Sequence, residues 1–234
     1  MQPIPEDWGR AVAVVAHPDD LEYGVASAVA RWTGQGKSVS YLLATRGEAG
    51  IAGMSPEEVA PLRMEEERRS AAVVGVSTVE FLDHPDGLVE YGIPLRRDLA
   101  AAFRRLQPEV VITMSFDLTW GEEGPINHAD HRAVGLAVVD ACRDAANEWV
   151  FPEAGPRCTG LRDAYVASVG SPTHYVDVTA TIDAGIASLR KHRAYLDGLG
   201  GDFDPDEFLR NMSGYIGLAA GVDYAVGLRR YPMG

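Results

Sequence analysis

The chain has 234 residues, of which 46% are hydrophobic, and this size suits one domain with a sizeable core. Its 34 acidic residues outnumber 21 lysines and arginines, giving a formal charge of −13. Such a surface repels nucleic-acid phosphates and anionic lipids, so we expect neither nucleic acid nor membrane as a partner. The opening segment MQPIPEDWGR lacks a basic region followed by an apolar one, and no apolar run approaches the roughly 18 residues of a membrane span. We therefore expect a soluble, cytoplasmic protein.

Short apolar runs alternate with helix-like segments in the first 147 residues. The runs are apolar at successive positions and rich in β-branched residues, as strands of a buried parallel sheet are: 11–16, 39–45, 78–83 and 109–115. Apolar spacing and capping signals predict helices from Leu21 to the glycines at 34 and 36, from Ser55 to Val74, over 94–106 and over 128–147. This alternation predicts an α/β fold, a three-layer Rossmann-like sandwich with a mostly parallel sheet.

The pattern loosens after about residue 150. The segment 151–160 is typical of a loop, 163–168 and 175–178 of short strands, and 180–196 of a helix, whereas the last forty or so residues are glycine-rich and show no readable pattern. Neither an internal repeat nor a low-complexity linker is present. We therefore expect a single domain over residues 1–234, with its motifs in a core of about 11–147 and a looser part over 148–234. The two cysteines are too few for a disulfide framework.

Two polar motifs follow predicted strands, HPDD after the first and HADH after the fourth. His17 and Asp20 are three residues apart, as are His128 and His131, so each pair points to one side of a first helical turn. Ligands of parallel α/β sheets bind at the carboxyl ends of the strands, and both motifs should face one cleft. Taken singly, each acid also suits a helix N-cap and each histidine an exposed helix position. Together they favour a catalytic zinc site of two imidazoles and one carboxylate, with an acid and a histidine left for proton transfer.

The segments AHPDD, ATRGEAG, FLDHPDG and NHADHRAVG resemble, in this order, the motifs of the LmbE-like (PIG-L) family of zinc-dependent N-acetylglucosaminyl deacetylases. The resemblance covers about residues 11–140. It implies a hydrolase that removes the N-acetyl group from an N-acetylglucosamine-type amino sugar or its glycoside, with zinc-bound water as the nucleophile. The expected partner is thus a small N-acetylated amino sugar.

The resemblance also implies roles for individual residues. His17, Asp20 and His131 would be the metal ligands, Asp19 the general base and His128 a catalytic histidine, with the choice of general acid between the last two left open.

Four further residues complete the expected site. Asp130 would act with the catalytic residues by orienting a histidine. Arg46, Arg63 and Asp86 would bind the substrate, although Arg46 suits a salt-bridged loop equally well. Trp120 suits both a rim over the sugar and packing against a helix.

Several residues differ from the family pattern, and these differences leave the metal site intact but leave the substrate open. Gly185 stands in place of a lysine, Ala194-Tyr195 in place of Ser-Gln, and Ile126 in place of a tyrosine. An amidase of the same mechanism with a different acyl group is therefore an alternative, as is a catalytically silent zinc-binding protein. Two histidines and an aspartate would also accept Fe²⁺ or another divalent first-row metal. The sequence leaves the sugar, the aglycone and the oligomeric state open, a homo-oligomer included.

Overall fold

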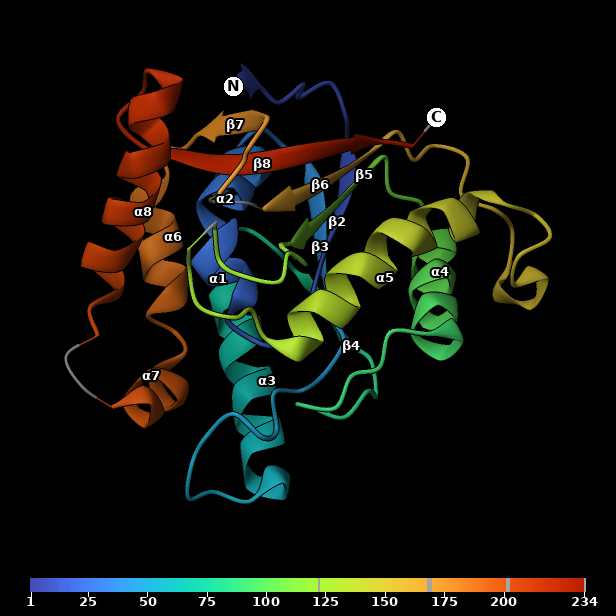
Figure 1. Cartoon of the computed structure of the whole chain (residues 1–234), viewed down its shortest axis with the longest axis horizontal. Helices are drawn as coiled ribbons and strands as arrows, with labels where there is room; N and C mark the ends of the chain where they lie inside the picture. Colours follow the sequence, from blue (N-terminus) through green and yellow to red (C-terminus); the bar gives the residue numbers. More distant parts are fainter. Residues whose placement is uncertain (122, 168–169, 201–202, 234) are drawn as a thin grey trace.

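In the computed structural model, which describes residues 1–121, 123–167, 170–200 and 203–233, eight strands form one sheet with helices on both faces (Figure 1). The strands are β1 (Gln2–Pro3), β2 (Arg10–Val15), β3 (Ser38–Leu43), β4 (Thr78–Phe81), β5 (Val110–Met114), β6 (Asp163–Ala167), β7 (His174–Asp177) and β8 (Ala225–Pro232). The helices are α1 (Asp20–Gly24), α2 (Ala26–Gly34), α3 (Pro56–Val73), α4 (Ile93–Leu106), α5 (Ala129–Ala146), the 3-10 turn η1 (Pro152–Ala154), α6 (Ile182–Leu189), α7 (Arg193–Leu199) and α8 (Pro205–Ala220).

The strand order is β1-β7-β8-β6-β5-β2-β3-β4. From β4 to β6 all neighbours are parallel, and β8 lies antiparallel between β6 and β7. The chain runs from β2 outward through β3 to β4, then returns to the other side of β2 as β5. This is the predicted mostly parallel α/β fold, and the reversal of strand order falls between β2 and β5.

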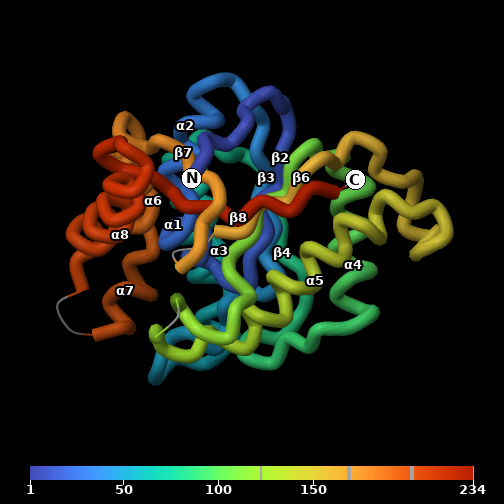
Figure 2. The backbone as a smooth tube through the Cα atoms, turned by 45° about the horizontal axis from the view of Figure 1, so that its top comes forward, coloured from blue at the N-terminus to red at the C-terminus, as the bar shows by residue number. Residues whose placement is uncertain are grey.

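Two apolar cores lie on the two faces of the sheet, because successive side chains of a strand point to opposite faces. In β2, Ala13 and Val15 join the core under α2 and α3. Val12 and Val14 join the core under α4 and α5. Figures 1 and 2 show α4 and α5 on one side of the sheet and α1, α2, α3, α6 and α8 on the other. Among the described helices, none combines the length and the apolar composition that crossing a bilayer requires.

Arg104 of α4 fixes the end of α5 that lies away from the polar motif. Its buried guanidinium donates to the carbonyl oxygens of Asp144 at 3.2 Å, Ala145 at 3.3 Å, and Asn147 and Val150 at 2.7 Å each. These carbonyls belong to the last turn of α5 and the loop after it, where the regular pattern of backbone hydrogen bonds of the helix ends. One buried side chain thus caps the helix whose first turn carries the HADH motif.

Several predicted boundaries were wrong. The helix expected from Leu21 breaks at Val25 into α1 and α2, and the helix expected over 180–196 is interrupted between α6 and α7, where His192 turns into the interior and is fully buried. The segment 151–160 contains the short turn η1. The unreadable C-terminal part forms α8 and β8. The strand predicted over 163–168 is present as β6, and residue 168 lies outside the described part.

Candidate metal centre and active site

The HPDD and HADH motifs meet at the carboxyl ends of β2 and β5. His17 follows β2 directly, and His131 lies in the first turn of α5, which follows β5. Because β2 and β5 pair in parallel where the strand order reverses, their ends form the crevice in which α/β sheets bind ligands. Apart from Arg46, each predicted site residue lies in this cluster or contacts one of its members, as the distances below show.

Three side chains converge within the reach of a single metal ion. His17 Nδ1 lies 3.1 Å from His131 Nε2. Asp20 places Oδ1 3.0 Å from His131 Nε2 and Oδ2 3.6 Å from His17 Nδ1. Zinc bonds of about 2.0–2.2 Å in tetrahedral geometry separate ligand atoms by roughly 3.3–3.6 Å. The two ring nitrogens, and one Asp20 oxygen beside each of them, therefore lie near the spacing that a zinc-sized cation requires.

Hydrogen bonds on the outer ring nitrogens orient both imidazoles. His17 Nε2 lies 3.0 Å from Asp86 Oδ1 and 3.1 Å from Asp130 Oδ2, while His131 Nδ1 lies 3.0 Å from Asn127 Oδ1. Acceptor oxygens at these positions require N–H on the outer nitrogens. When each ring is neutral, the inner nitrogens carry the lone pairs, which is the arrangement found around metal-bound histidines.

Carboxylates give this cluster an excess of negative charge. Burial alone would lower the pKa of His17, but hydrogen bonds with Asp130 and Asp20 raise it to about 12. Burial opposes ionisation of Asp20, yet the charge of His131 and its hydrogen bonds hold its pKa well below the usual range. The pKa of Asp86 is also lowered, against burial, by its hydrogen bond with His17. A set of ionised carboxylates and imidazoles of this kind suits a divalent cation.

Asp130 links three segments of the site. Its carboxylate accepts from the backbone N–H groups of Gly87 at 2.7 Å and Val89 at 3.1 Å, in addition to its contact with His17. The side chain is almost completely buried. The loop after β4, the end of β2 and the first turn of α5 are therefore held by one carboxylate.

Asp19 has a left-handed backbone, with φ of 100°, although it is not a glycine. Such a conformation costs about 1–3 kcal/mol and persists where surrounding contacts enforce it. Here the backbone N–H donates to Glu67 Oε2 at 3.2 Å, and Arg63 lies 3.3 Å from Asp19 Oδ1. Asp19 Oδ2 is buried and has no hydrogen-bond partner among the described residues. Burial raises the pKa of Asp19 to about 7, and the charge of Arg63 opposes this shift.

His128 is the N-cap of α5 and borders the same cluster. Its Nδ1 accepts from the Asp130 backbone N–H at 3.2 Å, so the neutral ring carries its proton on Nε2. Its ring centroid lies 4.9 Å from that of His17 and 5.2 Å from that of His131. Desolvation and then the charges of these two histidines lower the pKa of His128. The exposed ring can therefore offer a neutral N–H donor beside the candidate metal ligands.

The predicted substrate residues lie in three different settings. Arg63 is buried, with its guanidinium on Asp19 and on the carbonyl oxygens of Pro18 and Gly47, so it forms the wall behind Asp19. Asp86 contacts His17 directly. Arg46 instead pairs with Asp83 at the surface.

Trp120 presents its indole to the ring of His131, with centroids 5.7 Å apart and planes at 77°. It is partly exposed, so it forms one side of the opening to the cluster.

Sequence reasoning missed a second buried group behind Asp19. His192 Nε2 lies 3.5 Å from Glu22 Oε2 and 3.6 Å from Glu67 Oε2, and all three side chains are inaccessible to solvent. Glu67 is one of three consecutive glutamates in a charged helix, and nothing in that run distinguishes it from its neighbours. Asn127 could have been found, because it directly precedes the HADH motif.

Comparison with known proteins identifies a family and several relatives. The family model for PIG-L, GlcNAc-PI de-N-acetylase, matches residues 12–142. Diacetylchitobiose deacetylase of Thermococcus kodakarensis is 28% identical over 236 residues, covering 97% of this chain and 84% of the relative. The 1D-myo-inositol 2-acetamido-2-deoxy-alpha-D-glucopyranoside deacetylase of Kineococcus radiotolerans is 30% identical over 250 residues, covering 78% and 68%.

The fold is also that of a solved deacetylase. The N,N'-diacetylchitobiose deacetylase from Pyrococcus horikoshii superposes with a TM-score of 0.84 at 24% identity, covering 97% of this chain and 85% of that chain. The family match spans more than half of the sequence and contains both polar motifs of the metal cluster. The chain therefore belongs to the PIG-L family of de-N-acetylases.

Proposed function

We propose that this protein is a zinc-dependent hydrolase that removes the acetyl group from an N-acetylglucosamine-type amino sugar or its glycoside. The observation that carries the proposal is the convergence of His17, Asp20 and His131 on one point. Asp19 directly precedes Asp20, and its Oδ2 has no hydrogen-bond partner among the described residues. Relatives that match almost the whole chain are deacetylases of N-acetylated sugars, which supports the substrate class.

His17, Asp20 and His131 would hold the metal through their inward nitrogens and the carboxylate. A bound zinc ion supplies a Lewis acid and lowers the pKa of its water to about 7. Asp86, Asp130 and Asn127 would fix the two imidazoles, and Fe²⁺ or another first-row ion would fit the same donors.

The remaining groups of the chain carry the proton transfers. Asp19 Oδ2 would accept the proton of the attacking water, while Arg63 and the Glu67 contact keep its carboxylate and backbone in place. His128 Nε2–H would donate to the acetamide oxygen as negative charge develops there, an effect worth about 2.7–4 kcal/mol per donor. A carbon–oxygen bond forms, the carbon–nitrogen bond breaks, and Asp19 or His128 returns a proton to the amine. The products are acetate and a free amino sugar.

The proposal is tested by measuring metal content and acetate release on protein purified without chelator, using a panel of N-acetylglucosaminides. We expect about one zinc per chain and acetate from at least one glycoside. Chelation should abolish acetate release, and added zinc should restore it. A chain that neither contains nor takes up a divalent metal would refute the assignment of the three ligands.

Two substitutions separate binding from chemistry. Asp19→Asn should keep the metal and lose about 10²–10⁴-fold in kcat. His131→Ala should lose metal, whereas His174→Ala, on β7 between β1 and β8, is the matched control and should retain both metal and turnover. Full turnover in Asp19→Asn, or stoichiometric zinc in His131→Ala, would contradict the corresponding role.

An amidase for a different acyl group would share every one of these residues. The two functions are distinguished by offering glucosamine derivatives that differ only in the N-acyl group. Acetate release at a higher kcat/KM than the release of longer acids supports the deacetylase, and the reverse order supports the amidase.

A further inference from the structure

We propose that a cavity beside the metal cluster binds an apolar aglycone, so that the substrate is an N-acetylated amino sugar carrying an alkyl or aryl group. This inference rests on the proposed deacetylase function and narrows its substrate class.

The cavity has a volume of about 680 Å³ and lies between α8, β8 and the end of α1. Its wall is formed mainly by aromatic and aliphatic side chains, namely Tyr23, Met114, Trp120, Phe208, Met212 and Ile216. Among the residues that line it, none carries a charged side chain. Four glycines also contribute to the wall, at positions 24, 121, 170 and 227. Binding pockets for small organic ligands have this size and this apolar character.

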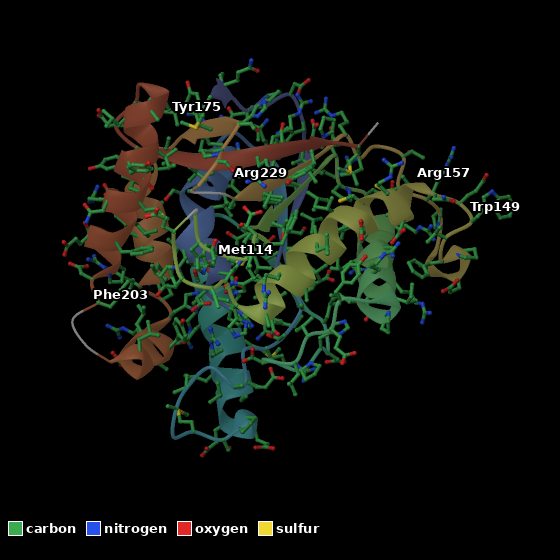
Figure 3. All side chains as sticks on the ribbon, in the orientation of Figure 1. Met114, Trp149, Arg157, Tyr175, Phe203 and Arg229 are labelled. Atoms are coloured by element: carbon green, nitrogen blue, oxygen red, sulfur yellow. The ribbon has the colours of Figure 1, made fainter. Side chains whose placement is uncertain are left out.

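The cavity adjoins the reactive centre through two of its wall residues. Trp120 lines it and also contacts the His131 ring, 5.7 Å away between centroids. Tyr23 lies three residues after Asp20, and its pKa is raised by burial and by the nearby carboxylates of Asp19 and Asp20. Met114 lies near the centre of the molecule at the carboxyl end of β5 (Figure 3). A group attached to a sugar at the metal cluster can therefore extend into the cavity.

The apolar wall indicates which part of the substrate occupies the cavity, namely the aglycone rather than the acetyl group or a sugar ring. The cavity could hold about twenty water molecules at roughly 30 Å³ each. The acetyl group, with its single methyl, would fill only a small part of it. The sugar ring carries hydroxyls that lose their hydrogen bonds to water and need polar partners. A second sugar has the same need, and the polar side-chain atoms of the wall are limited to the hydroxyls of two tyrosines and Ser213 and the indole N–H. A hydrocarbon or aryl group requires no such partners.

The outer end of the cavity is open and aromatic. Phe208 and Tyr215 of α8 line it and are 39% and 69% exposed. Phe203 stacks on Phe208 and on Tyr23, with ring centroids 5.5 and 5.8 Å apart, and lies on the α8 side of the molecule (Figure 3). A chain longer than the buried part of the cavity can continue along these rings towards solvent.

The test compares methyl, butyl and hexyl N-acetylglucosaminides, in both anomers, as substrates of the metal-loaded enzyme. Full burial of a methylene corresponds to about a fourfold gain in binding, so even half of that free energy predicts about 30-fold higher kcat/KM for hexyl than for methyl. Tyr215→Ala and a cavity-filling Met212→Trp should reduce this ratio at least fivefold and leave the methyl glycoside unchanged. Leu218→Ala is the matched control, since Leu218 lies on α8 outside the cavity and is 85% exposed.

Three results would overturn the inference. If kcat/KM does not change from the methyl to the hexyl glycoside, and the methyl glycoside is turned over well, the apolar aglycone is refuted and the deacetylase function still holds. A rise along an N-acyl series instead would assign the cavity to the acyl group. A flat series together with a dimer that Tyr215→Asp dissociates would assign it to a second copy of the chain. Absence of acetate from every glycoside would refute the proposed function itself.

Discussion

Asp130→Ala should weaken both the fold and the metal site, and the two losses can be measured separately. The substitution removes the acceptor of the Val89 N–H, which is buried, and of the Gly87 N–H, which is partly buried. A buried donor left without a partner costs about 1–3 kcal/mol, so we expect the free energy of unfolding to fall by about 2–5 kcal/mol. His17 Nε2 loses one of its two carboxylate contacts, which should reduce metal affinity about 10–100-fold.

The assay is urea unfolding of chelator-treated protein, because bound metal would add its own stabilisation to the folded state. Metal affinity is then measured by competition with a chromogenic chelator. Asp140→Ala is the matched control on the same helix, since Asp140 accepts only an exposed hydrogen bond from Tyr91. If Asp130→Ala unfolds like Asp140→Ala, or binds metal like the wild type, the role given to Asp130 is wrong.

Four further substitutions test helix packing, helix capping and the hydrogen bonds of one carboxylate. Gly135→Ala would place its Cβ 2.9 Å from the carbonyl oxygen of Met114, so the free energy of unfolding should fall by about 1–3 kcal/mol. In Gly34→Ala the new Cβ meets no atom within 4 Å, so the free energy of unfolding, measured by thermal denaturation, should rise by up to about 1 kcal/mol. Arg104→Lys loses the planar fork of donors and should cost about 2–3 kcal/mol in urea unfolding, and a cost under about 0.5 kcal/mol would refute its capping role. Burial alone would raise the pKa of Glu6, but its hydrogen bonds with Arg31, Gln35 and Trp32 lower it. The ionised Glu6 side chain therefore stabilises the folded state fully above its unfolded pKa, and this stabilisation is lost as the pH falls through the folded pKa. Glu6→Gln should therefore cost about 1 kcal/mol at pH 7 and less near pH 4, and an equal cost at both would contradict this.

The sequence was sufficient to predict the central sheet and the meeting of the two motifs. The strands ending at Val15 and Met114 are buried on both faces, so their residues are apolar at successive positions and easily recognised. Since neighbouring parallel strands end at one edge, His17 and His131 could be placed together before any coordinates were known.

The rest depended on contacts between distant segments. β8 contains two arginines, and its pairing with β6 and β7 joins residues about 50 to 70 positions apart, so no local pattern marks it. The break before α7 follows from the burial of His192 against Glu22 and Glu67, which are more than 100 residues earlier. The left-handed backbone of Asp19 is likewise held by a distant side chain, Glu67. Arg46 looked like a site residue because of its motif, and its partner Asp83 comes from another loop.

The position of β8 constrains the order in which this protein can assemble during synthesis. β8 lies between β6 and β7 in the sheet but follows both along the chain. While the ribosome is still making α8, the open edge of β6 has no neighbour, and β7 and β1 have no sheet to join. The half of the sheet that carries the HPDD and HADH motifs, from β4 to β6, can form at this stage because its pairs involve earlier segments only. The nascent chain can therefore bring the two motifs together before the wall of α8 and β8 completes the adjacent cavity.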